Sequence, residues 1–117
     1  DVFSQRVHER VLCQVPCYVT DQQMLWDGNV ENLSEGGALI MMKNPMLLPG
    51  NIINIHFKAV NDSDVPFNVT AEILTKRLVK TKIHHDTGIH YAVKFLSKSM
   101  AGTEQIRNWI KKDIKNN

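Results

Sequence analysis

The strongest constraint on the fold is an apolar–polar alternation with a period of two that recurs along the chain. It is clearest from Val11 to Val19, where every odd position is valine or cysteine. Such alternation is typical of a strand that buries one face. The inward residues that it predicts in later runs are Ile53, Ile55, Phe57 and Ala59, then Phe67, Val69, Ala71 and Ile73, and finally Ile89, Tyr91, Val93 and Phe95. Shorter strands are expected over residues 25–32 and 38–42.

Turn-forming residues separate these runs. They are Gly36-Gly37, Pro49-Gly50, the polar cluster at 61–64 and the Asp-Thr-Gly at 86–88. Six strands with one apolar face each favour an all-β antiparallel barrel or sandwich. Pro16 lies inside the first run, which predicts an edge position or a bulge, because proline has no N–H to donate to a neighbouring strand.

The period changes only near the C-terminus. After Ser97 and Ser99, either of which suits a helix cap, the apolar residues Ile106, Trp109, Ile110 and Ile114 follow at helical spacing. We expect an amphipathic helix over 98–115 that lays its apolar stripe on a barrel formed by 11–96, closing an open end. The first ten residues show no sustained pattern and are expected to form a flexible arm. A chain of 117 residues has little room for two cores, so 1–117 is expected to be a single domain.

Charge and composition exclude several classes of function. The net charge of +2 is too small to argue for nucleic-acid binding, and no DNA partner is expected. The basic run of Lys76, Arg77, Lys80 and Lys82 is interpreted as a solvated strand edge, with a partner or nucleic-acid patch as the alternative. A single-strand-binding barrel of the OB type would need exposed stacking aromatics, whereas most aromatics here fall on inward positions.

The sequence also predicts the cellular environment. No apolar run approaches the ~20 residues of a membrane helix, and no leader segment opens the chain, so we expect a cytoplasmic protein without a membrane span. Cys13 and Cys17 are four apart on one strand and therefore about 13 Å apart, too far for a disulfide. They are expected to be reduced core thiols.

No pattern in the chain predicts catalysis. Ser34 and the cysteines are potential nucleophiles, but no histidine–aspartate pattern accompanies them, and paired carboxylates and a P-loop are lacking. We therefore expect no enzyme and no cofactor. The histidine cluster at His84, His85 and His90, with Asp86, favours a solvated turn over a metal site.

Two short motifs remain. Arg6 and Arg10 form an RxxxR just before the first strand, and Asn32, Ser34 and Gly37 form an NxSxxG between the second and third strands. Each motif is common by itself: two arginines four apart are usually solvated, and an Asn-x-Ser before glycines is usually a turn. The order of the two motifs within a six-strand pattern is more informative.

With both motifs in this order, and with the Gly88–Leu96 segment as a last strand, the chain resembles the PilZ domain family from Arg6 to about Ile114. The resemblance implies a six-stranded antiparallel PilZ-type β-barrel with a C-terminal helix. It also implies a bacterial receptor for cyclic di-GMP that changes conformation and signals to an unknown protein partner or flanking domain, with motility, biofilm, exopolysaccharide or virulence as possible outputs.

Carried over residue by residue, the resemblance assigns ligand contacts to Arg6, Arg10, Asn32 and Ser34, and the backbone geometry of the turn to Gly37. Asn32 stands where aspartate is commoner in the family. Gln5 stands where many members have another arginine, which leaves the number of bound ligands open. The alternative is a PilZ-type domain that binds partners and no nucleotide.

The residue types suit this ligand. A guanidinium matches the O6 and N7 acceptors of guanine as a bidentate fork, stacks on purines and pairs with phosphate. Gly36 and Gly37 have no side chain and permit positive φ, so the main chain can approach a ligand there.

Overall fold

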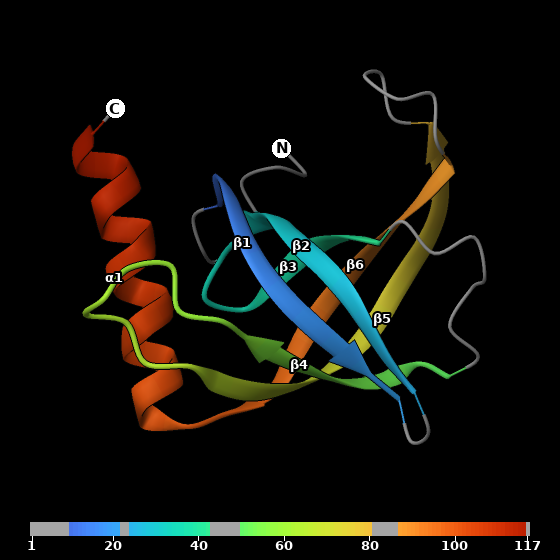
Figure 1. Ribbon diagram of the computed structural model, residues 1–117, viewed down its shortest axis with the longest axis horizontal. Coiled ribbons are helices and arrows are strands. Elements are labelled where there is room, and N and C mark those ends of the chain that lie inside the picture. The colour runs from blue at the N-terminus through green and yellow to red at the C-terminus, as the bar shows by residue number, and fades with distance from the viewer. Residues whose placement is uncertain (1–9, 22–23, 43–49, 81–86, 117) are drawn as a thin grey trace, which may run out of the picture.

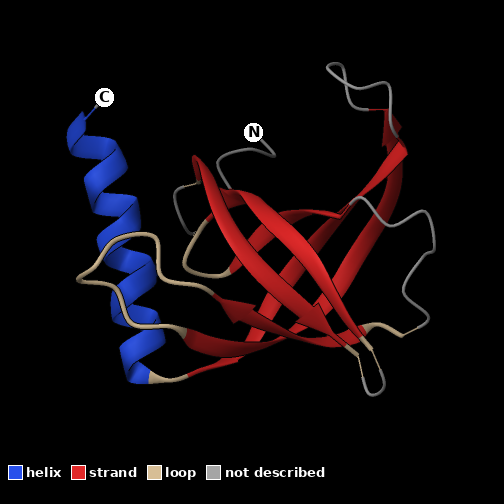
Figure 2. Ribbon diagram, in the orientation of Figure 1, coloured by secondary structure: helices blue, strands red, loops and turns tan. Residues whose placement is uncertain are grey.

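The computed structural model describes residues 10–21, 24–42, 50–80 and 87–116, which form a closed β-barrel and one helix (Figure 1). The strands are β1 (Val11–Thr20), β2 (Leu25–Leu33), β3 (Gly37–Met42), β4 (Ile52–Phe57), β5 (Phe67–Lys80) and β6 (Thr87–Lys98). The helix, α1 (Met100–Asn116), stands against one end of the barrel (Figure 2). The six strands and one helix in this part of the chain match the prediction. The sequence left an antiparallel barrel or sandwich open, and the sheet closes into a barrel.

The strands follow the order β1-β2-β3-β6-β5-β4 around the barrel, and all pairs are antiparallel. Consecutive strands pair as hairpins, with the exception of β3 and β4. β3 pairs with β6 instead, and β4 pairs with β1. Closure comes from four register pairs between β1 and β4, running from Cys17 opposite Phe57 to Thr20 opposite Asn54. The alternation of side chains does not specify these two long-range pairings.

The predicted inward faces form the core. Its buried residues include Phe57, Ile55, Tyr91 and Phe95, whereas Ala59 is exposed because β4 already ends at Phe57. The prediction for Ala59 was therefore wrong. Burying this many aliphatic and aromatic side chains is the main stabilising contribution, at about 1.5–3 kcal/mol for each large side chain.

Helix α1 begins where Ser99 caps it. The Ser99 Oγ accepts a hydrogen bond from the Gly102 N–H at 3.0 Å, so Ser99 rather than Ser97 is the cap. Ile106 and Ile110 are buried against the barrel, and the Trp109 ring stacks 6.1 Å from Phe57, as the helical spacing predicted.

Bulges interrupt the ladders. The β1–β2 register shifts between Leu12 and Val15, where Cys13 is half-buried and its thiol donates to the Val30 carbonyl. Pro16 lies just beyond the β4 ladder, which begins at Cys17, so its missing N–H costs no strand pairing with β4. β5 and β6 run longer than predicted, to Lys80 and Lys98. Within the described residues, no helix has the length and apolarity needed to cross a membrane.

Candidate functional site

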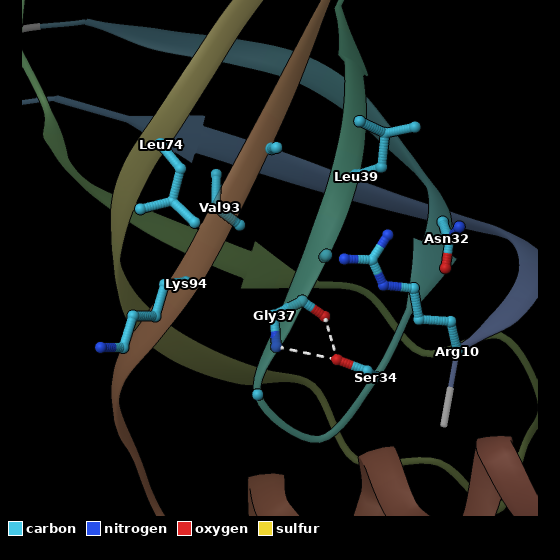
Figure 3. Close-up of a pocket in the computed structure, with 11 residues that line it drawn as sticks. Arg10, Asn32, Ser34, Gly37, Leu39, Leu74, Val93 and Lys94 are labelled. Atoms are coloured by element: carbon cyan, nitrogen blue, oxygen red, sulfur yellow. Dashed lines mark hydrogen bonds between the residues drawn. The ribbon is translucent and has the colours of Figure 1, made fainter. Parts of the chain in front are cut away.

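The motif residues within the described ranges meet at a hollow on the outer surface of the barrel (Figure 3). Its volume is about 230 Å³. Four of the five predicted site residues line it, namely Arg10, Asn32, Ser34 and Gly37, together with Gly36, Ala38, Leu39, Leu74, Ala92, Val93 and Lys94. Arg6 and Gln5 lie outside the described residues. The fold thus brings the start of β1 next to the β2–β3 turn.

Arg10 is an exposed residue directly before β1. Its side chain reaches over the hollow toward Asn32 and the β2–β3 turn (Figure 3). Within the described ranges, it forms no hydrogen bond or ion pair. None of the five N–H donors of the guanidinium is therefore used by a described residue.

Asn32 reaches the hollow because of a bulge in β2. The β2–β3 register shifts between Val30 and Asn32, so Glu31 is the extra residue. Asn32 then pairs in register with Leu12 on one side and Leu39 on the other. Bulges re-aim side chains in this way, and they are common next to functional sites.

The Ser34 hydroxyl closes the β2–β3 turn. Its Oγ accepts a hydrogen bond from the Gly37 N–H at 3.1 Å and donates to the Gly37 carbonyl at 3.3 Å. The backbone N–H of Ser34 donates to the same carbonyl at 2.9 Å. A hydroxyl has one donor and two acceptor lone pairs, so one lone pair remains for a ligand. The Ser34 hydroxyl therefore stabilises the β2–β3 turn whether or not a ligand is bound.

Gly37 is needed for a steric reason that differs from the predicted one. Its φ does not lie in the left-handed region; instead, an added Cβ would stand 2.2 Å from the Val93 carbonyl oxygen. The left-handed backbone that glycine permits is therefore not adopted at this residue. The absent side chain lets β3 approach β6, where Gly37 pairs with Lys94.

The turn that contains Ser34 and Gly37 is also tied to β6 and α1. The Phe95 N–H donates to the Gly36 carbonyl at 2.8 Å, and the Lys98 ammonium donates to the Glu35 carbonyl. The Arg107 guanidinium of α1 forms an ion pair with the Glu35 carboxylate. The middle of the NxSxxG motif thus connects the hollow to the C-terminal helix.

Sequence reasoning did not identify the apolar wall of the hollow. Leu74 lies at the bulge where the β5–β6 register shifts between Ile73 and Thr75, and it is largely exposed. Leu39 and Val93 continue the wall (Figure 3). Ala92 also lines it. The signal was present in the adjacent apolar pair Ile73-Leu74, which breaks the period-two pattern of β5.

Other polar features lie elsewhere on the barrel. A shallower hollow of about 440 Å³ is lined by Tyr18, Thr20, Leu25, Asn54, His56 and Asn68. The Lys58 ammonium lies 3.7 Å from the Tyr18 ring centroid, and its hydrogen bond with Tyr18 raises the pKa of this lysine. The expected histidine cluster at 84–86 lies outside the described residues, and His90 pairs with Glu31 at 3.0 Å. Across the described ranges, no three metal-ligating side chains gather.

Comparisons with known proteins give matches to the sequence and to the fold of this chain. The family model for the PilZ domain matches residues 4–112. No curated protein matches the chain. Among solved structures, the PilZ domain of YcgR from Escherichia coli with c-di-GMP has a TM-score of 0.71 at 17% identity, covering 96% of this chain and 93% of that one.

Two longer proteins have the same fold over about half their length. The Bacillus subtilis inhibitor of motility MotI/DgrA has a TM-score of 0.73 at 9% identity, covering 97% of this chain and 53% of its own. PlzA of Borreliella burgdorferi, in complex with c-di-GMP, has a TM-score of 0.69 at 12% identity, covering 93% of this chain and 52% of its own.

Proposed function

Because the chain belongs to the PilZ domain family, we propose that it is a receptor domain for cyclic di-GMP, and that it acts by binding rather than by catalysis. The observation that carries the proposal is the convergence of Arg10, Asn32, Ser34 and Gly37 on one hollow. These residues come from two motifs about twenty positions apart in sequence. The solved relatives with the same fold include two whose structures hold c-di-GMP. The chain is expected to act in the cytoplasm.

Each side chain at the hollow has a distinct task in this proposal. The Arg10 guanidinium binds a guanine edge through its fork or stacks on the base, and it attracts the phosphates. Asn32 offers an amide donor and acceptor to a second guanine edge. Ser34 shapes the turn and contributes its remaining lone pair.

The hollow can hold only part of such a ligand. Its volume of about 230 Å³ is below the roughly 300–1,000 Å³ of pockets that enclose drug-sized molecules. We propose that Arg6 supplies the second guanidinium, since it stands four residues before Arg10. A micromolar site needs about 8 kcal/mol, and each charge-assisted hydrogen bond contributes roughly 1.5–3 kcal/mol. Two arginines with Asn32 and a stacking surface can reach that total after the cost of ordering, whereas one arginine cannot.

The proposed signal runs from the turn to the helix. A ligand that binds Asn32 and Ser34 will favour one arrangement of the turn, and Glu35 in that turn contacts both Lys98 and Arg107. Occupancy is therefore expected to restrain the first half of α1. A partner or flanking domain that touches α1 would sense this change. Because one similar protein is named as an inhibitor of motility, motility is the first output to examine.

Arg10 variants test the site most cleanly, because this exposed side chain is bonded to no described residue. Arg10→Ala should lower the affinity for cyclic di-GMP at least tenfold, which corresponds to about 1.4 kcal/mol. Arg10→Lys keeps the charge but removes the fork and should weaken binding nearly as much. The matched control is Arg77→Ala, an exposed arginine of β5 outside the hollow. Equal affinity in Arg10→Ala and Arg77→Ala would refute the proposed site. Ser34→Ala is a poorer test, because it also breaks the turn.

A further inference from the structure

Glu31 occupies a place in β2 that the neighbouring strands do not fix. The register with β1 passes directly from Val30 to Asn32, and the register with β3 does the same, so Glu31 has no register partner among the described strands. Val30 and Leu33 are both fully buried, whereas the two residues between them are partly exposed. The bulge therefore presents two adjacent side chains, those of Glu31 and Asn32, on the outer surface of the barrel.

The Glu31 side chain is held instead by β6. The His90 Nε2 and the Glu31 Oε1 lie 3.0 Å apart, which is hydrogen-bond distance. His90 stands between the buried residues Ile89 and Tyr91, so its ring lies on the outer surface as well. The two side chains are 31% and 25% exposed, so water screens their contact less than a contact in open solvent. Because β3 lies between β2 and β6, this contact reaches across a whole strand.

The strands that this contact joins also line the hollow. Asn32 comes from β2 and Ala92 from β6, and between them lies Leu39 of β3, which is the register partner of both (Figure 3). Among the described residues, Glu31 and His90 are not part of the lining. Any effect of the pair on a ligand is therefore transmitted by Asn32, the neighbour of Glu31 in the bulge.

We propose that Glu31 and His90 are positioning residues for the ligand: their contact fixes the bulge of β2 and so holds the Asn32 amide at the hollow. This inference rests on the proposed binding of cyclic di-GMP. A polar side chain that is oriented before the ligand arrives avoids the free-energy cost of being ordered on binding. Charge alone predicts the opposite effect, because a carboxylate near the hollow repels the phosphates of the ligand. Removal of Glu31 therefore separates the two effects by sign.

Calorimetric titration with cyclic di-GMP measures this sign. Glu31→Ala should lower the affinity about three- to tenfold, the range of one hydrogen bond. Glu31→Gln should stay within about twofold of the unmodified chain, because its amide can still hydrogen-bond to His90. The matched control is Asp27→Ala, which removes a carboxylate of the same strand whose ion pair, at 3.7 Å, is with Lys58. This control should also change the affinity by less than about twofold.

His90 variants test the same contact from the other strand. His90→Ala should lower the affinity about as much as Glu31→Ala, and the double variant should bind no more weakly than either, since all three lose one contact. Without ligand, the ¹⁵N order parameter of the Asn32 side-chain amide should fall in His90→Ala and stay unchanged in Asp27→Ala. This second measurement reports the orientation of Asn32 directly.

The outcomes separate this inference from the proposed function. An unmodified chain that does not bind cyclic di-GMP would overturn both. Binding that Glu31→Ala leaves unchanged or strengthens would overturn the positioning role alone, and so would an Asn32 order parameter that His90→Ala does not lower. Thermal melts check that each variant is folded at the temperature of the titration. If Glu31→Ala is not folded there, His90→Ala provides the same comparison.

Discussion

Replacing Gly37 with alanine should destabilise the barrel even when no ligand is present. An added Cβ would lie 2.2 Å from the Val93 carbonyl oxygen, whereas real Cβ contacts essentially never fall below 3.0 Å. β3 and β6 would have to separate locally by about 0.8 Å. The adjoining bond from the Phe95 N–H to the Gly36 carbonyl, at 2.8 Å, would then stretch beyond useful length.

The expected cost combines these two effects. Overpacking typically costs about 1–3 kcal/mol, and a lost backbone hydrogen bond adds roughly 1 kcal/mol. A total near 3 kcal/mol should lower Tm by roughly 12 °C, at about 4 °C per kcal/mol for a domain of 117 residues. Gly50→Ala is the matched control, because its added Cβ meets only the Ile52 carbonyl at 3.9 Å. Thermal melts followed by circular dichroism measure both variants. If Gly37→Ala melts within about 2 °C of the unmodified chain, the steric reasoning is wrong and the glycine serves the ligand alone.

Three further predictions concern groups around the site and core. Burial alone would raise the pKa of Asp64, but hydrogen bonds from the Asn61 and Val60 amides, Trp109 and Gln105 outweigh it and lower that pKa below 3.8. Asp64→Asn should therefore lower the free energy of unfolding by about 1–2 kcal/mol at pH 7. Urea unfolding should show this difference between variant and unmodified chain above about pH 4, and the difference should vanish as pH falls through the lowered pKa of Asp64. A difference that stays constant down to pH 2 would contradict this reasoning. Burial raises the pKa of Cys17 to about 12, so a thiol reagent at pH 8 should label at most one cysteine in the native chain and two in denaturant, and two fast native labels would be inconsistent with the buried thiol. Arg107→Ala should weaken cyclic di-GMP binding by about 1.5–5-fold through the exposed Glu35 pair, and calorimetry showing no change would separate the helix from the site.

The alternation of side chains was sufficient to predict the strands and the inward aromatics. Burial of one face imposes a period of two, so Ile55, Phe57 and Tyr91 could be placed in the core without coordinates. Which strands meet across the barrel could not be predicted in the same way. The β1–β4 and β3–β6 pairings depend on shape and closure, and no local pattern encodes them.

The residues of the candidate site also fall into a group that the sequence predicted and a group that it did not. The resemblance to the PilZ family assigned Arg10, Asn32, Ser34 and Gly37 to one site, and the fold brings these four residues to one hollow. Leu74 was missed because its exposure depends on a bulge that inserts one residue into β5. The steric role of Gly37 was also missed, since it depends on a strand more than fifty positions away.

A calorimetric titration of the purified chain with cyclic di-GMP, with GTP as the control nucleotide, tests the central claim most directly. The account predicts saturable binding of cyclic di-GMP with a Kd in the micromolar range or tighter, and little or no heat from GTP. The fitted stoichiometry would also show how many ligands the chain binds with Gln5 in place of a further arginine. Absence of heat and of any thermal shift at tens of micromolar ligand would contradict the receptor assignment and leave a PilZ domain that acts through protein partners alone.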